Sequence, residues 1–331
     1  MGRVGELGAG FACGGFCIQF GCDWVAFLYA SIAAILGMRL RQVCNESGLN
    51  HYMGIAISAF VATIIAWAST LLPAEWTSTP WHPLLACALF IVPGVPLINF
   101  VDDMLDNYIQ VGIVRAVNTL LMVAAMAFGI AFAVKLCRIE NFFPTISMVP
   151  HHQYWEYAIA AAISAMGFSM IFNIQRRLLW VVAIGGIIAV CTRNFVNLGP
   201  STDNIGLDMG LVIGSFSGAV LVSLIAIKAV HWFHVPNHVL TIPSVIPMIP
   251  GVLMYRMLFG IININVQSID QVTPLMKAIE SGVNSGLVIM CIALGVAIPN
   301  IFGRRFIASS KNKRLAELLK ERKARGKFVE W

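Results

Sequence analysis

Charged side chains are scarce in this chain. Asp, Glu, Lys and Arg make up 11% of its 331 residues, whereas hydrophobic residues make up 58%. A soluble globular domain carries about 25% charged residues, so this composition excludes an ordinary soluble protein. Apolar runs of about 20 residues recur along the whole chain, and each is long enough to cross a bilayer. The sequence therefore predicts an all-α polytopic membrane protein.

Several signatures of metal and catalytic sites are also absent. The eight cysteines form no Cys-x-x-Cys pair and fall mostly in apolar segments, where we expect them to act as small packing residues. The chain has no Gly-x4-Gly-Lys-Ser/Thr motif, which excludes a P-loop pump. Neither His-Glu-x-x-His nor Gly-x-Ser-x-Gly occurs, which argues against common metalloprotease and esterase chemistries. We expect no enzyme activity, no metal and no cofactor.

The basic residues gather at the C-terminal end. Residues 303–331 hold ten Lys/Arg and three Glu, while the rest of the chain holds twelve Lys/Arg and thirteen Asp/Glu. A basic segment after a last span is typical of the cytoplasmic side, where it can contact anionic lipid. We therefore expect a basic cytoplasmic tail over residues 304–331, with membrane lipid rather than nucleic acid as its partner.

Hydrophobicity predicts ten membrane spans. The first is short and rich in glycine, and it lacks the basic start and cleavage site of a signal peptide. Loops on the side of the N-terminus contain seven Lys/Arg before the tail, and loops on the other side contain four. This bias predicts a multi-pass protein of the cell (inner or plasma) membrane with both termini in the cytoplasm. The spans are 5–21, 24–40, 51–72, 84–101, 109–136, 154–172, 178–194, 205–227, 239–262 and 282–302.

The two halves of the chain resemble each other. Five spans per half is an odd number, so the second half must enter the membrane from the opposite side. This is the inverted-topology repeat of many secondary transporters. We predict one five-helix repeat over residues 1–141 and a second over 142–303. The matching stretches follow one another in the same order in both halves: 14–20 with 166–172, 91–96 with 248–253 and 125–131 with 291–297.

Pro-Gly pairs interrupt spans four and nine at matched positions, Pro93-Gly94 and Pro250-Gly251. Proline removes a backbone donor and glycine tolerates the unusual dihedral angles that follow. Freed backbone groups occur at membrane depth only inside protein or beside a wet cavity. A plain kink explains either proline alone, but the matched pairs favour functional breaks in helices four and nine.

Charge is concentrated after the first break. A carboxylate inside hydrocarbon costs at least about 2.5–3.5 kcal/mol, so such groups are paired or line a wet path. Asp103 precedes Arg115 by twelve residues, and a turn between spans four and five would bring them together. Asp103 is then either a gating or proton-coupling group or half of a structural ion pair. We expect Asp102 and Asp106 to be loop charges that face water.

The second half offers further candidates. Arg256 and the adjacent Tyr255 lie in span nine, and we include both in the site. The Arg256 side chain can neutralise a substrate carboxylate, pair with Asp103 or Asp208, or snorkel to the interface. Asp208 either faces water or is a second coupling carboxylate. A glycine stripe predicts a smooth packing face on span eight: Gly206, Gly210, Gly214 and Gly218. Three histidines beside a boundary proline are expected to be interfacial rather than metal ligands: His231, His234 and His238.

The motifs resemble those of the threonine/serine exporter (ThrE) family. The Pro-rich stretch 242–260 is similar to the Pro-Gly motif of that family's second half, and the likeness extends over residues 5–302. The first-half pattern comprises Pro93-Gly94, Asn99, Asp103, Gly112 and Arg115.

The resemblance implies a ten-span secondary transporter that exports small polar metabolites of the threonine/serine type, driven by the proton-motive force. A dicarboxylate exporter of the succinate type is the alternative, and a channel is a weaker one. Family members usually carry a soluble cytoplasmic region before the first span, whereas Met1 lies almost at the membrane here. A homo-oligomer and a separate soluble cytoplasmic component both stay open as partners.

Overall fold

The computed structural model describes residues 2–73, 75–139, 152–200, 205–233, 235–262 and 272–324. Over these ranges the chain is helical and has no strand. The predicted boundary between the two repeats at residues 141 and 142 falls outside them, as does His234.

The first half contains three helices, then a broken segment, then one more long helix. The helices before the break are α1 (Gly2–Gln19), α2 (Trp24–Glu46), α3 (His51–Trp67) with η1 (Ala68–Leu71), α4 (Pro83–Ala86) and η2 (Leu89–Ile91). After the break come α5 (Gly94–Leu105) and α6 (Ile109–Leu136).

The second half repeats this order. Its helices before the break are α8 (Tyr154–Ile171), η3 (Arg176–Leu178), α9 (Leu179–Asn197), α10 (Leu211–Phe233), α11 (Asn237–Val245) and η4 (Ile246–Met248). After the break come α12 (Gly251–Ile262) and α13 (Val272–Ala324).

Polar side chains fix several helix starts. Asp23 is the N-cap of α2 and accepts the backbone N–H of Ala26, and Asn50 caps α3 by accepting the N–H of Tyr52. At the start of α8, Gln153 and Glu156 form a capping box. Such side chains satisfy donors that a helix leaves open at its first turn.

Six helical segments are long and apolar enough to cross a membrane, or up to eight if each of two bent helix pairs counts as one span. The six are Trp24–Glu46, His51–Leu71, Ile109–Leu136, Arg176–Asn197, Leu211–Ala229 and Leu275–Phe302. The first and sixth predicted spans correspond to α1 and α8, which form as helices but do not belong to this set. The described residues thus account for at most eight of the ten predicted spans.

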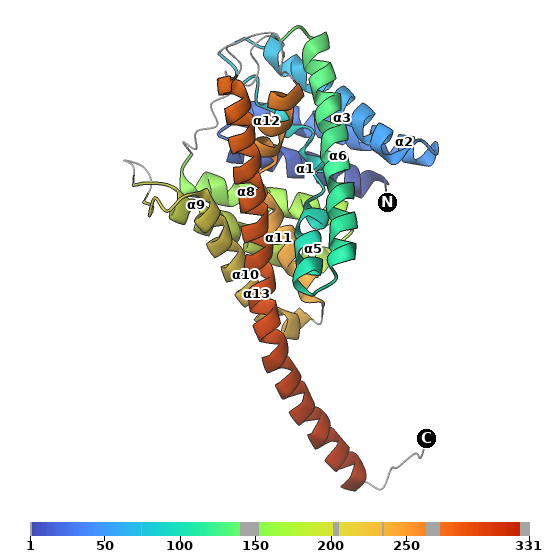
Figure 1. The fold of residues 1–331 in the computed structure, drawn as a ribbon, viewed down its shortest axis with the longest axis vertical. Coiled ribbons are helices and arrows are strands. Elements are labelled where there is room, and N and C mark those ends of the chain that lie inside the picture. Colours follow the sequence, from blue (N-terminus) through green and yellow to red (C-terminus); the bar gives the residue numbers. More distant parts are fainter. Residues whose placement is uncertain are drawn as a thin grey trace.

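One sequence prediction is wrong at the start of a helix. The eighth span was expected from residue 205, but α10 begins at Leu211, so Gly206 and Gly210 lie outside the helix and the predicted glycine face is half as long. Leu207 and Met209 instead donate backbone hydrogen bonds to the last turn of α9. At the C-terminal end, α13 runs as one helix through residue 303 to Ala324, so the described part of the predicted tail is helical. Its C-terminal part projects beyond the other helices (Figure 1).

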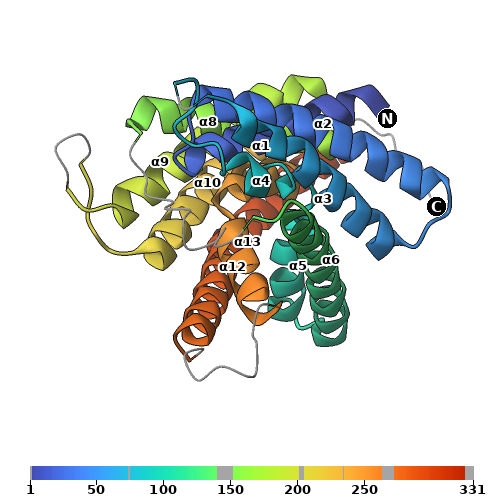
Figure 2. The same ribbon diagram turned by 90° about the horizontal axis from the view of Figure 1, so that it is seen from above.

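A closely packed helix pair in the core joins the two halves. A Cβ atom built on Gly15 would lie 2.6 Å from the carbonyl oxygen of Ala160, and one on Gly8 would lie 2.7 Å from that of Gly167. The start of α1 therefore meets the end of α8, and the two helices run antiparallel. Seen from above, α1, α2 and α8 lie along one side of the molecule, and the pairs α5–α6 and α12–α13 lie on the other (Figure 2).

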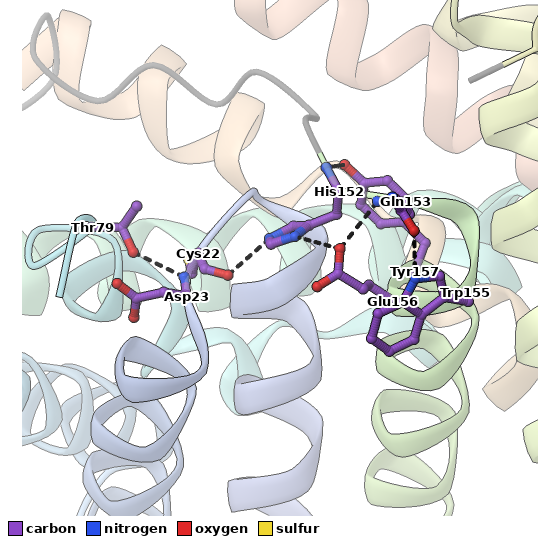
Figure 3. A network of polar contacts seen from close by, with 8 residues as sticks. All are labelled: Cys22, Asp23, Thr79, His152, Gln153, Trp155, Glu156 and Tyr157. Atoms are coloured by element: carbon purple, nitrogen blue, oxygen red, sulfur yellow. Dashed lines mark hydrogen bonds and ion pairs between the residues drawn. The ribbon is translucent and has the colours of Figure 1, made fainter. Parts of the chain in front are cut away.

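A polar network connects the turn after α1 with the start of α8 (Figure 3). The ring of His152 lies between two oxygen acceptors: its Nδ1 is 3.0 Å from Glu156 Oε2 and its Nε2 is 2.9 Å from the carbonyl oxygen of Cys22. Asp23, which follows Cys22 in the chain, accepts hydrogen bonds from Thr77 Oγ1 and Ser78 N. The α1–α2 turn is therefore held both to the second half and to the loop before α4.

Candidate functional site

Both predicted helix breaks are present. The chain bends by 54° between η2 and α5 and by 55° between η4 and α12. Pro93 is the N-cap of α5, and Pro250 directly precedes α12. Because proline carries no N–H, the helical ladder cannot continue through either position.

The two breaks contact each other in the core. A Cβ atom on Gly94 would lie 3.0 Å from Cδ1 of Ile249, and one on Gly251 would lie 2.6 Å from Cδ2 of Leu89. Leu89 and Ile249 are themselves 1% and 3% exposed. The glycine of each break therefore packs against the short 3-10 turn of the other break. Apolar side chains fill the contact between them.

Cavity 1 lies along α5. It has a volume of about 480 Å³. Helices α5 and α11, the residues that follow α8 and the first two turns of α6 supply its lining. The lining residues are Val95, Asn99, Asp102, Asp103, Arg115, Phe172, Ile174, His238, Val239, Ile242 and Pro243.

Oppositely charged groups meet in cavity 1. Arg115 Nη1 donates to Asp103 Oδ2 across the α5–α6 turn, and both side chains are partly exposed. His238 Nε2 lies 4.0 Å from Asp102 Oδ2. Cavity 1 therefore holds two carboxylates that have partners within the cavity and that solvent still reaches.

Cavity 2 lies at the start of α12 and has a volume of about 230 Å³. The ends of α1 and α9 and the start of α10 complete it. Its lining residues are Gln19, Phe20, Arg193, Asn194, Asn197, Leu211, Pro247, Met248, Ile249, Pro250, Val252, Leu253 and Arg256.

The two cavities lie on opposite sides of the paired breaks. Cavity 1 includes Phe172 at the end of α8 and cavity 2 includes Phe20 just after α1, and these helices run antiparallel. The α11–η4–α12 segment passes from one to the other, since Pro243 lines cavity 1 and Pro247 lines cavity 2. In Figure 1, α5 lies in the lower part of the bundle and α12 in the upper part.

Half of the ten predicted site residues line these cavities. Asn99, Asp103 and Arg115 line cavity 1, and Pro250 and Arg256 line cavity 2. Arg256 and Asp103 therefore face different cavities. Pro93, Gly94 and Gly251 lie at the contact between the breaks.

Two predicted site residues lie elsewhere. Tyr255 is fully buried and donates its hydroxyl to the sulfur of Met126 on α6, at 3.1 Å. Asp208 is exposed in the loop before α10, has a left-handed φ of 52° and lines neither cavity. Among the described residues, no cluster of three His, Cys, Asp or Glu side chains could hold a metal ion.

Sequence reasoning missed several lining residues. Asp102 was expected to be a loop charge and His238 an interfacial residue, yet both line cavity 1. Gln19, Arg193 and Asn194 were not singled out for the site, although Arg193 aligns with Arg41 in the internal repeat. That alignment, together with a charged residue near the end of an apolar span, is the signal that could have identified Arg193.

Comparison with known proteins covers both halves of the chain. Residues 4–137 match the family described as "Putative threonine/serine exporter", and residues 157–302 match "Threonine/Serine exporter, ThrE". The chain is 32% identical over 130 residues to the "Probable succinate transporter subunit YjjP" of Klebsiella aerogenes and 30% identical over 130 residues to that of Escherichia coli strain K12.

Each of these alignments covers 39% of this chain and 50% of the relative, so the chain spans about half the length of the curated relatives it matches. No solved structure matches the chain. The two family matches cover the helices that carry both breaks and both cavities. This chain therefore belongs to the threonine/serine exporter family, with both halves of the family present in one polypeptide.

Proposed function

We propose that this protein is a secondary transporter that exports small polar solutes by alternating access. The observation that carries the proposal is the pair of cavities on opposite sides of the paired Pro-Gly breaks. A solute in one cavity reaches the other only if the contact between Gly94 and Ile249 and the contact between Gly251 and Leu89 open. Broken helices at corresponding positions in two halves are the usual place of such a site.

An inverted repeat supports this mechanism. We propose that residues 1–141 and 142–303 form two five-helix repeats, followed by a tail over 304–331, and that α1 and α8 complete ten spans. The same order of helices recurs in the two halves, and α1 and α8 pack antiparallel. The sequence offsets also relate the cavity linings to each other, by pairing Phe20 with Phe172, Val95 with Val252 and Asn99 with Arg256.

The family gives two classes of solute. Threonine/serine-type amino acids follow from the family's description, and small dicarboxylates follow from the succinate transporter subunits that the chain resembles over 130 residues. We propose that the proton-motive force drives export, with Asp103 as the coupling group. Arg115 donates to Asp103 in the closed pair, and a conformational change that separates the two residues would leave the carboxylate without this partner.

We place the protein in the cell membrane with both termini in the cytoplasm, from the distribution of Lys and Arg. Cavity 1 then faces the cytoplasm and cavity 2 the outside. The relatives are named as subunits, so we propose that this chain also assembles, either with a second copy or with a separate soluble component.

Efflux from preloaded proteoliposomes tests the function. Vesicles loaded with labelled threonine, serine or succinate are followed with and without a pH gradient. A transporter gives saturable efflux that unlabelled solute on the opposite side accelerates, and an inward proton gradient increases it. Flux that does not saturate and shows no counter-transport would favour a channel, and no flux of any of the three solutes would contradict the proposal.

A further inference from the structure

The two cavities differ in the charge of their linings. Cavity 1 contains two carboxylates, Asp102 and Asp103, together with Arg115 and His238. Among the described residues that line cavity 2, none is Asp or Glu. Its polar lining consists instead of two guanidinium groups and three amides: Arg193, Arg256, Gln19, Asn194 and Asn197.

Two of these amide side chains are buried and have polar atoms without a hydrogen-bond partner among the described residues. Gln19 is 7% exposed, and neither its Nε2 nor its Oε1 has a hydrogen-bond partner within the described part of the chain. Asn194 is 4% exposed, and its Nδ2 likewise has none there. Buried polar groups are almost always paired in folded proteins, so each exception calls for an explanation. Both residues line cavity 2, where a bound solute could supply the partner.

Arg193 provides the charge at the same place. Its Nε and Nη2 each donate to Asn194 Oδ1 at 3.1 Å, which fixes the plane of the guanidinium group. No carboxylate of the described residues forms a salt bridge with it. A guanidinium group inside a membrane protein ordinarily has an anionic partner or lines a wet path, and its fork of donors matches a carboxylate.

From this geometry we propose that cavity 2 binds a carboxylate group of the exported solute through Arg193, Gln19 and Asn194, and that it prefers solutes of net negative charge. The inference rests on the proposed function, and it favours a small dicarboxylate over a zwitterionic amino acid. The ammonium group of an amino acid would meet the guanidinium group of Arg193 in cavity 2 and no carboxylate of the described lining. A volume of about 230 Å³ is below that of pockets for drug-sized ligands and suits a short-chain acid.

Calorimetric titration of the purified full chain in detergent provides the test. The probes are succinate, threonine and succinamide, which has the shape of succinate without its charges. We expect succinate to bind about ten-fold or more tightly than either of the other two. Arg193→Gln should weaken succinate binding by at least about ten-fold, because hydrogen bonds to charged groups have this magnitude. Gln19→Leu should weaken it by a smaller factor.

The matched control is Arg177→Gln. Arg177 is exposed near the start of α9, donates to Gln175 and lines neither cavity, so its loss should leave the Kd unchanged. If Arg193→Gln does not fold, Arg193→Lys is used, which keeps the charge and loses the fork, and should still weaken succinate binding. Threonine bound as tightly as succinate, or an unchanged Kd in the folded Arg193 variant, would overturn the proposal.

Exchange in proteoliposomes separates this inference from the transport function. If the wild type exchanges solute and the Arg193 variant exchanges succinate equally well, the carboxylate site is wrong and the transporter stands. If succinate binding depends on Arg193 but the wild type exchanges neither succinate nor threonine, the site stands and the transport function is wrong.

Discussion

Gly94 lies against Ile249, so close that a Cβ atom on the glycine would be 3.0 Å from Cδ1 of the isoleucine. The two residues belong to different breaks, and cavities 1 and 2 lie on either side of their contact. In the proposed mechanism, this contact is the barrier that a solute must pass. Its energetics can be tested without any knowledge of the solute.

Gly94→Ala should lower the Tm of the purified protein, because the added methyl group overpacks a closed apolar contact, which costs about 1–3 kcal/mol. Ile249→Ala should lower it too, by leaving a cavity. In the double variant the two effects should partly cancel, since the new methyl group occupies space that the isoleucine vacates. Strictly additive changes in Tm would mean that the two side chains do not share this space.

Gly167→Ala should be more damaging than Gly94→Ala. A Cβ atom there would lie 2.3 Å from the backbone nitrogen of Ala12 on α1, and backbone cannot move aside as a side-chain end can. Gly286→Ala is the control: Gly286 also lies inside a helix, but nothing is within 4 Å of its Cβ position, so helix propensity alone should make the change neutral or slightly stabilising. Thermal unfolding of Gly167→Ala and Gly286→Ala gives the comparison. Equal Tm values for these two variants would contradict the close packing of α1 against α8.

Asp103→Asn should leave the protein folded and exchanging solute, but should remove the response of efflux to a pH gradient. Arg115→Ala should lower Tm more strongly, because it leaves a partly buried carboxylate without its partner. Gradient-driven efflux that is unchanged in Asp103→Asn would restrict the pair to a structural role.

Asp23 should make stability depend on acid pH. Burial alone would raise the pKa of its carboxyl group, but hydrogen bonds from Ala26 N, Thr77 Oγ1 and Ser78 N hold the pKa below its ordinary value of 3.8. Its contribution is therefore fully present above about pH 3.8 and is lost as the pH falls through the folded-state pKa.

Asp23→Asn keeps a helix cap but not the charge. We expect the wild type to have the higher Tm from pH 7 to about pH 5, and the difference to shrink below pH 4. A difference that does not vary with pH would exclude a role for the charge of Asp23.

The sequence predicted the fold where composition determines it. The apolar run 109–136 coincides with α6, and both breaks lie where proline removes a backbone donor. It failed at residues 205–210, whose apolar side chains look like part of a span. There the backbone N–H groups of Leu207 and Met209 donate hydrogen bonds to the end of α9. These are tertiary contacts, which the hydrophobicity of the segment does not predict.

The site was predictable where partners are near in the chain. Asp103 and Arg115 lie on either side of a short turn, so their pairing follows from a helical hairpin. Gln19 and Arg193 meet in cavity 2 from helices 174 positions apart, and Tyr255 meets Met126 from the other half. Such meetings depend on how the two halves pack, and no local pattern specifies them.

The most direct test of alternating access is labelling of Val95→Cys and Val252→Cys from each side of oriented membrane vesicles. The two positions correspond in the proposed repeat, one in cavity 1 and the other in cavity 2. With an impermeant thiol reagent and wild type as background, each cysteine should react from one side only, the two from opposite sides. A solute gradient should raise the labelling of one as it lowers that of the other. Labelling of both from the same side would contradict the account.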